Sequence, residues 1–140
     1  MKVGLVAMSG VRAYNEELTK LGLTLPGFVD RNKIIASLPS LGLLTLAGMT
    51  PQRFDVEYIE IADIKNVNEL PNSFDIVAIS TYSAQIFEAY ELADRYRNKG
   101  IKTVIGGPHV TCLPEEAKEH CDSVVIGEGE PSWLQLLDDC

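Results

Sequence analysis

The chain has 140 residues, of which 46% are hydrophobic, so it is long and apolar enough to form one domain with a buried core. Its net charge of −8 argues against nucleic acid and membrane as partners, because nucleic acid and anionic lipid would repel it. Three cysteines without Cys-x-x-Cys spacing argue against a disulfide framework or a self-contained zinc site, and fit the cytoplasm.

Five short segments have the pattern of β-strands. They are Lys2–Met8, Asp55–Ile61, Asp75–Ser80, Lys102–Ile105 and Ser123–Ile126. The first is apolar but too short for a signal peptide or a membrane span, so a strand is expected there. The sequences "IVAIS" and "TVIGG" in the third and fourth are continuous apolar runs, which are typical of strands covered on both faces.

Helical patterns separate these strands. The clearest is Ala84–Asn98, where apolar residues recur at three- and four-residue spacing, and Gly100 is expected to end the helix with a positive φ angle. Leu41–Met49 is apolar nearly all round, which predicts a buried helix. Prolines beside acidic residues predict two further helix starts, at Pro114 and Pro131.

Strands that alternate with helices predict a parallel sheet with right-handed crossovers. Five strands in a chain of this length indicate an α/β fold of the flavodoxin-like type, with strand order 2-1-3-4-5 and helices on both faces. Residues 1–140 are expected to form a single domain with a long insertion, residues 9–39, after the first strand. Connections of this length are usually lids, binding loops or partner surfaces.

Ligands of such sheets bind at the carboxyl ends of the strands. Small and polar residues follow three of the predicted strands, and they are the candidate binding residues: Ser80, Thr81, Tyr82, Ser83, Gly106, Gly107, Pro108, His109, Gly127, Glu128 and Gly129. The glycines suit a close approach of backbone to a ligand, although ordinary tight turns explain them too. The acids of a phosphoacceptor, a flavodoxin phosphate loop and a complete dinucleotide fingerprint are all missing from the sequence.

Several of these residues have a second interpretation. Glu128 and Glu130 have a spacing that suits an acid/base pair, but a carboxylate beside Pro131 is more ordinarily a helix cap. His109 fits a solvated loop as well as a ligand contact. The remaining histidine and the large aromatic residues are expected to be structural: His120, Tyr90, Tyr96 and Trp133.

The segments "VIGGPHVTCLPEEA" and "CDSVVIGEGEPSWLQLL" resemble the amino-terminal cobalamin-binding domain of cobalamin-dependent radical S-adenosylmethionine enzymes. The likeness extends to "SLPSLGLLTLAGMTP" and "FDIVAISTYSAQIFEAYELADRYRNKG", and so covers most of the chain from Ser37 onward. It implies that the candidate residues bind cobalamin, with Ser80 and Thr81 bonded to its nucleotide tail and the glycine loops close to the tail or the corrin. Gly107→Val would then abolish cobalamin binding at little cost in stability.

Two motifs of that family are absent. No histidine that could bind cobalt follows the first strand, where the sequence reads "MSGVRAYNEEL", so no metal-binding or catalytic residue is expected in this chain. The Cys-x-x-x-Cys-x-x-Cys segment, which holds a four-iron cluster and S-adenosylmethionine, lies on a downstream barrel in family members. We therefore expect an excised domain of a longer enzyme, such as a methyltransferase. The alternatives are a degenerate homologue with an interaction or regulatory role, and a stand-alone α/β enzyme that uses Glu128 or His109.

Overall fold

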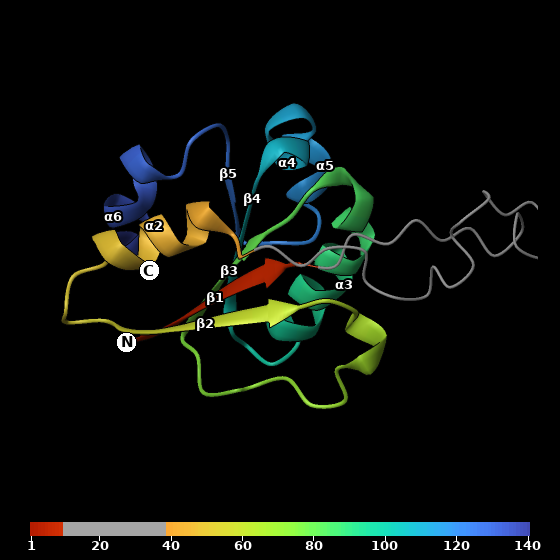
Figure 1. The fold of residues 1–140 in the computed structure, drawn as a ribbon, viewed down its shortest axis with the longest axis horizontal. Helices are drawn as coiled ribbons and strands as arrows, with labels where there is room; N and C mark the ends of the chain where they lie inside the picture. The colour runs from red at the N-terminus through yellow and green to blue at the C-terminus, as the bar shows by residue number, and fades with distance from the viewer. Residues whose placement is uncertain (10–38) are drawn as a thin grey trace, which may run out of the picture.

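The computed structural model describes residues 1–9 and 39–140, so the expected insertion, residues 9–39, lies almost entirely outside the described residues. Helices and two short 3-10 helices, η1 and η2, alternate with strands along the rest of the chain (Figure 1). The order is β1 (Lys2–Met8), α2 (Leu41–Met49), β2 (Asp55–Ile61), η1 (Ile64–Asn66), β3 (Ile76–Ser80), η2 (Ser83–Gln85), α3 (Ile86–Arg97), β4 (Lys102–Gly106), α4 (Pro108–Cys112), α5 (Pro114–Ala117), β5 (Ser123–Val125) and α6 (Glu130–Asp139).

The strands form one parallel sheet in the order β2-β1-β3-β4-β5, which confirms the predicted flavodoxin-like fold. The register pairs Ala7 with Ser80, Ser80 with Gly106, and Gly106 with Val125. Four strands therefore end at nearly the same level. The loops that follow them meet at one edge of the sheet, where ligands of parallel α/β sheets bind.

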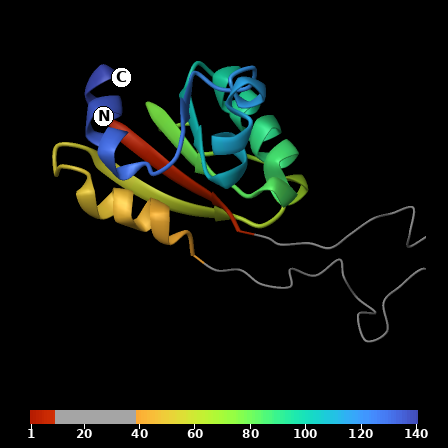
Figure 2. The same ribbon diagram turned by 90° about the horizontal axis from the view of Figure 1, so that it is seen from above.

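Helices cover both faces of the sheet (Figure 2), with α3, α4 and α5 on one side and α2 and α6 on the other. Alternate residues of the strands point to the two sides, as the pleat of a strand requires. Val6 and Ile105 pack toward Tyr96 of α3. Leu5, Ala78 and Val104 belong to a second cluster, which includes Leu43 of α2 and both Trp133 and Leu137 of α6.

The predicted element boundaries agree closely with the structure, and φ of 76° at Gly100 confirms its role after α3. Helix α4 was not predicted. It begins at Pro108, directly after Gly107, and proline at the first helical turn is the same signal that identified the starts at Pro114 and Pro131. No helix within residues 1–9 and 39–140 is long and apolar enough to cross a membrane.

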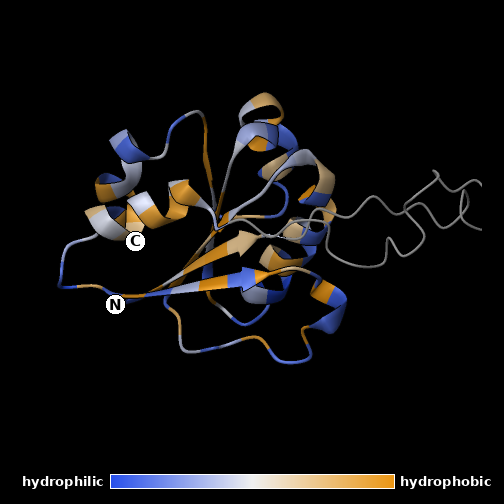
Figure 3. Ribbon diagram, in the orientation of Figure 1, coloured by the Kyte–Doolittle hydropathy of each residue, from blue (hydrophilic) through white to orange (hydrophobic). Residues whose placement is uncertain are grey.

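Helix α2 is where the sequence prediction is wrong. Only Leu43 is buried, whereas Leu41 is 77% exposed, Leu44 40% and Met49 39%. The helix packs on the sheet along one side, and the exposed Leu41 and Leu44 show that its other side presents apolar residues to solvent. Figure 3 shows the hydrophobic composition of this helix. Its apolar composition predicted burial on all sides, but the described part of the chain supplies a covering layer on only one.

Candidate functional site

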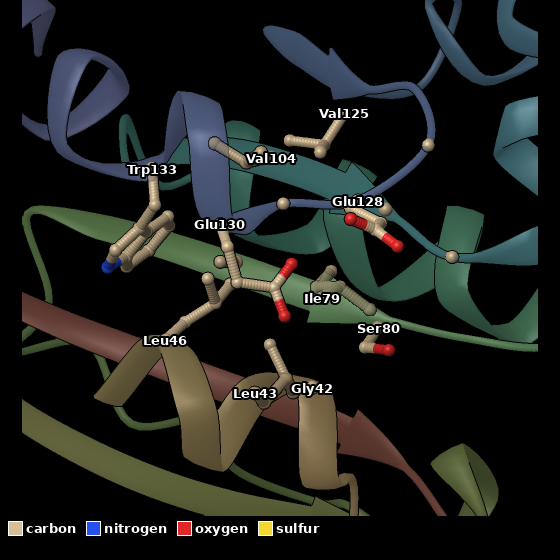
Figure 4. A pocket seen from close by; sticks show the side chains of 15 residues that line it. Gly42, Leu43, Leu46, Ile79, Ser80, Val104, Val125, Glu128, Glu130 and Trp133 are labelled. Atoms are coloured by element: carbon tan, nitrogen blue, oxygen red, sulfur yellow. The ribbon is translucent and has the colours of Figure 1, made fainter. Parts of the chain in front are cut away.

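A cavity of about 220 Å³ lies at the carboxyl ends of β3, β4 and β5, between α2 and α6 (Figure 4). Apolar side chains and glycines form most of its wall, and the polar side chains are one hydroxyl and two carboxylates. The lining residues are Gly42, Leu43, Leu46, Ala78, Ile79, Ser80, Val104, Gly106, Gly107, Val125, Gly127, Glu128, Gly129, Glu130 and Trp133. An apolar cavity with a few polar groups is the usual form of a small-molecule site.

The cavity brings together part of the predicted site. Among the candidate residues, those in the cavity wall are Ser80, Gly106, Gly107, Gly127, Glu128 and Gly129. The others are outside it: Thr81 is buried, Tyr82 is 63% exposed, Ser83 and Pro108 are exposed, and His109 is partly exposed. A role for these residues in contacting a larger ligand along the rim stays a prediction.

Gly107 is required by the packing of the chain itself. Its φ is 120°, and a Cβ atom there would overlap the carbonyl oxygen of Thr81 and lie 3.4 Å from its carbonyl carbon. Thr81 is itself held in place, since its backbone N–H donates to the carbonyl of Gly106 at 3.3 Å. The expectation that Gly107→Val would cost little stability is therefore wrong, because any side chain meets backbone of the same protein.

Thr111 on α4 joins the two glycine loops of the cavity. Its hydroxyl donates to the carbonyl oxygen of Gly107 at 3.1 Å and accepts from the backbone N–H of Gly127 at 3.0 Å. One side chain thus fixes the loop after β4 to the loop after β5. Thr111 is not among the predicted site residues, because helix α4 was not predicted from the sequence.

We expect Thr111→Val to release the Gly127 loop while the sheet stays folded. Valine keeps the shape of threonine but removes the hydroxyl, and one hydrogen bond contributes about 1 kcal/mol, which corresponds to roughly fivefold in an opening equilibrium. The measurement is the hydrogen-exchange rate of the Gly127 amide, with Thr111→Ser as the control that keeps the hydroxyl. Equal exchange rates in the valine variant and the unaltered protein would contradict this role.

Helix α6 contributes a wall of the cavity whose residues were not predicted as site residues. Trp133 is 1% exposed, and its indole N–H donates to the hydroxyl of Thr50, directly after α2, at 2.8 Å. Glu130, in the first turn of α6, is partly buried, and Figure 4 shows its side chain extending into the cavity toward α2. Gly129 is the N-cap residue of α6, so Glu130 lies in the first helical turn rather than at the cap position, and its carboxylate is near the positive helix end as expected.

The histidines belong to a polar network on the other face of the sheet. His109 Nε2 lies 3.4 Å from Glu116 Oε1, which accepts a hydrogen bond from the Tyr90 hydroxyl at 2.9 Å. Burial and the neighbouring Glu116 raise the pKa of Tyr90 well above its ordinary value. His120 stacks on the Tyr90 ring and its Nδ1 lies 2.8 Å from Asp94, in keeping with the structural role predicted for it.

The cavity wall contains no cysteine and no histidine. Residues 1–9 and 39–140 contain no group of three or more His, Cys, Asp or Glu side chains suited to a metal ion. Cys121 is buried, which raises the pKa of its thiol to about 11, while Cys112 and Cys140 are exposed. None of the three lines the cavity.

The chain matches the protein-family model described as B12 binding domain over residues 29–137. It is 36% identical over 100 residues to bacteriochlorophyllide d C-8(2)-methyltransferase of Chlorobaculum tepidum, covering 71% of this chain and 22% of that protein. The C-12(1)-methyltransferase of the same organism is 34% identical over 103 residues, covering 74% and 22%. An uncharacterized methyltransferase of Pyrococcus horikoshii is 35% identical over 111 residues, covering 71% and 24%.

The chain therefore spans between a fifth and a quarter of the length of these relatives. Among solved structures, the N-terminal domain of a hypothetical protein of Thermotoga maritima has a TM-score of 0.50 and 28% sequence identity. The similarity covers 69% of this chain and 79% of that one.

Proposed function

Because the chain belongs to the B12-binding domain family, we propose that its cavity holds the nucleotide tail of cobalamin. The family match confirms the resemblance that the glycine-rich segments carry. The observation that carries the proposal is the cavity at the carboxyl ends of β3, β4 and β5, whose walls are mostly apolar and whose rim includes glycines of two loops. At about 220 Å³ it is smaller than the roughly 300–1,000 Å³ of a whole drug-sized ligand site, and suits one bicyclic ring system.

The residues present fit the aromatic base of the tail. Leu43 and Leu46 of α2 and Trp133 of α6 give the cavity apolar walls, which would pack against a flat ring and exclude water from it. The Ser80 hydroxyl lines the same cavity and would bond the polar part of the tail. Gly106 lets the backbone approach the cofactor without a side chain in between.

For the longer protein we propose a radical S-adenosylmethionine methyltransferase. Bound cobalamin would supply the cobalt that carries a methyl group, and the present residues would bind and orient the cofactor. Two observations support the proposal. Three relatives are named as methyltransferases, and this chain spans only a fifth to a quarter of their length. The four-iron cluster and S-adenosylmethionine would bind a downstream barrel. A Cys-x-x-x-Cys-x-x-Cys segment should therefore follow Cys140 in the gene. A reading frame without that segment would contradict the proposal of a radical S-adenosylmethionine methyltransferase.

Cobalamin binding can be measured through Trp133, the one tryptophan of the chain, because it lines the cavity. We expect methylcobalamin to quench its fluorescence with saturation at one equivalent, since the corrin absorbs light near the emission of tryptophan. Free N-acetyltryptophanamide under the same conditions corrects for absorption by the cofactor in solution. Quenching no greater than in that control would favour a degenerate homologue that has lost the cofactor.

A further inference from the structure

Glu130 is a partly buried acid that has no partner among the residues the structure describes. It is in the cavity wall, and no hydrogen bond or ion pair joins it to another described residue. Other carboxylates at the surface are paired, for example Asp138 with Arg53 and Glu115 with Lys118. Glu130 has no such partner, and its side chain extends into the cavity (Figure 4).

The surroundings of Glu130 define what chemistry would pair with it. Leu43, Leu46 and Ile79 line the same cavity, and an ionised carboxylate against apolar surface is unfavourable unless a hydrogen-bond donor or a cation meets it. None of the lining residues is basic, and Glu128 on the rim carries a second negative charge. The part of the wall around Glu130 therefore disfavours the phosphate of a nucleotide, which would have to lie elsewhere, and favours a group that donates a hydrogen bond. The positive end of α6 makes the charge tolerable there but does not satisfy it.

We propose that Glu130 recognises the nucleotide tail of the cofactor by accepting a hydrogen bond from it, an inference that rests on the proposed function. Two groups of the tail could donate this bond. One is a hydroxyl of the ribose, and the other is the protonated ring nitrogen of the benzimidazole base, which becomes free to take a proton once the base leaves the cobalt. In either case Glu130 determines specificity for a cofactor that carries its nucleotide.

The test compares Glu130→Gln with the unaltered protein in equilibrium dialysis against methylcobalamin and against methylcobinamide, which lacks the nucleotide. We expect the variant to bind methylcobalamin roughly 10- to 100-fold more weakly, the range for a hydrogen bond to a charged group. Its affinity for methylcobinamide should be unchanged. Glu119→Gln is the matched control, because it removes the same charge from an exposed position outside the cavity wall and should leave affinity unchanged. Glu128→Gln, on the exposed rim of the same cavity, measures how much of the loss comes from the charge of this loop alone.

Measurements at pH 6 and pH 8 distinguish the two donors. In the cofactor free in solution the base stays on cobalt, so protonation accompanies binding only if Glu130 pairs with the ring nitrogen. The unaltered protein would then bind up to about tenfold more tightly per unit fall in pH, and Glu130→Gln would lose that dependence. If a ribose hydroxyl is the donor, Glu130→Gln should weaken binding by the same factor at pH 6 and at pH 8. The ionisable side chains in the cavity wall are only Glu128 and Glu130, and the Glu128→Gln control accounts for the former.

Three results would overturn the inference. They are an unchanged affinity in Glu130→Gln, an equal loss for methylcobinamide, and an equal loss in Glu128→Gln. The second would mean that Glu130 acts on the corrin or on the fold, and the third that only the charge of the loop matters. Failure of the unaltered protein to bind methylcobalamin would instead overturn the proposed function, and this inference with it.

Discussion

Gly107→Ala is expected to lower the free energy of unfolding by roughly 2–6 kcal/mol in the absence of any ligand. About 1–3 kcal/mol comes from a side chain at a φ of 120°, a conformation that residues other than glycine rarely adopt. A further 1–3 kcal/mol or so comes from forcing Cβ against the carbonyl of Thr81, which has to move. Since a domain has only about 5–15 kcal/mol in total, urea unfolding should show a large shift of the midpoint.

Gly127→Ala and Gly100→Ala are the matched controls. Both glycines have positive φ, 77° and 76°, but a Cβ atom at either would have no heavy atom within 4 Å. These variants should lose only the conformational part, about 1–2 kcal/mol. If Gly107→Ala is no less stable than Gly100→Ala, then Thr81 does not restrict that position. Contact with a ligand would then be the remaining reason for a glycine at residue 107.

Gly42→Leu is expected to stabilise the fold and to weaken cobalamin binding at the same time. Gly42 lies in α2 and lines the cavity, and a Cβ atom there would have no heavy atom within 4 Å. Replacing a helical glycine should add about 0.5–1 kcal/mol of stability. The leucine would occupy space needed by the tail, so affinity should fall roughly 10- to 100-fold, as expected for an overpacking cost of about 1–3 kcal/mol.

Gly48→Leu separates the two effects. Gly48 lies in the same helix with equally open space around it, but it is not part of the cavity wall. The variant should therefore gain similar stability, measured by thermal unfolding, and keep its affinity, measured by Trp133 fluorescence. Equal loss of affinity in both variants would show that stiffening α2, rather than filling the cavity, reduces binding.

The sheet was predictable because its strands are short apolar runs that end in glycine or small polar residues, and such runs allow few alternatives. The strand order followed from alternation of strands and helices in a chain of this length. Helix α2 was not predictable in the same way. Its sequence is apolar on every side, so periodicity carries no information about which side faces the sheet, and burial of Leu43 but not Leu44 depends on packing alone.

Sequence reasoning located the loops of the site but not its walls. Ser80, Gly106 and Gly127 follow strands, and the topology places the ends of those strands together. Gly42 is distant in sequence from those loops, and Trp133 lies in the helix that follows the last of them. The packing of α2 and α6 on one face of the sheet brings both residues to the cavity. Glycine within an otherwise apolar helix is a signal that could have indicated Gly42 as a position of close approach.

The position of α6 in the chain also bears on biosynthesis. The cavity has Gly42 of α2 in one wall and Glu130 and Trp133 of α6 in another. It therefore forms only after α6 has been translated. Until then a nascent chain on the ribosome exposes the strand residues that Trp133 and Leu137 will cover. The proposed cobalamin site is therefore incomplete until α6 has left the ribosome, and the cofactor can be loaded only after that point.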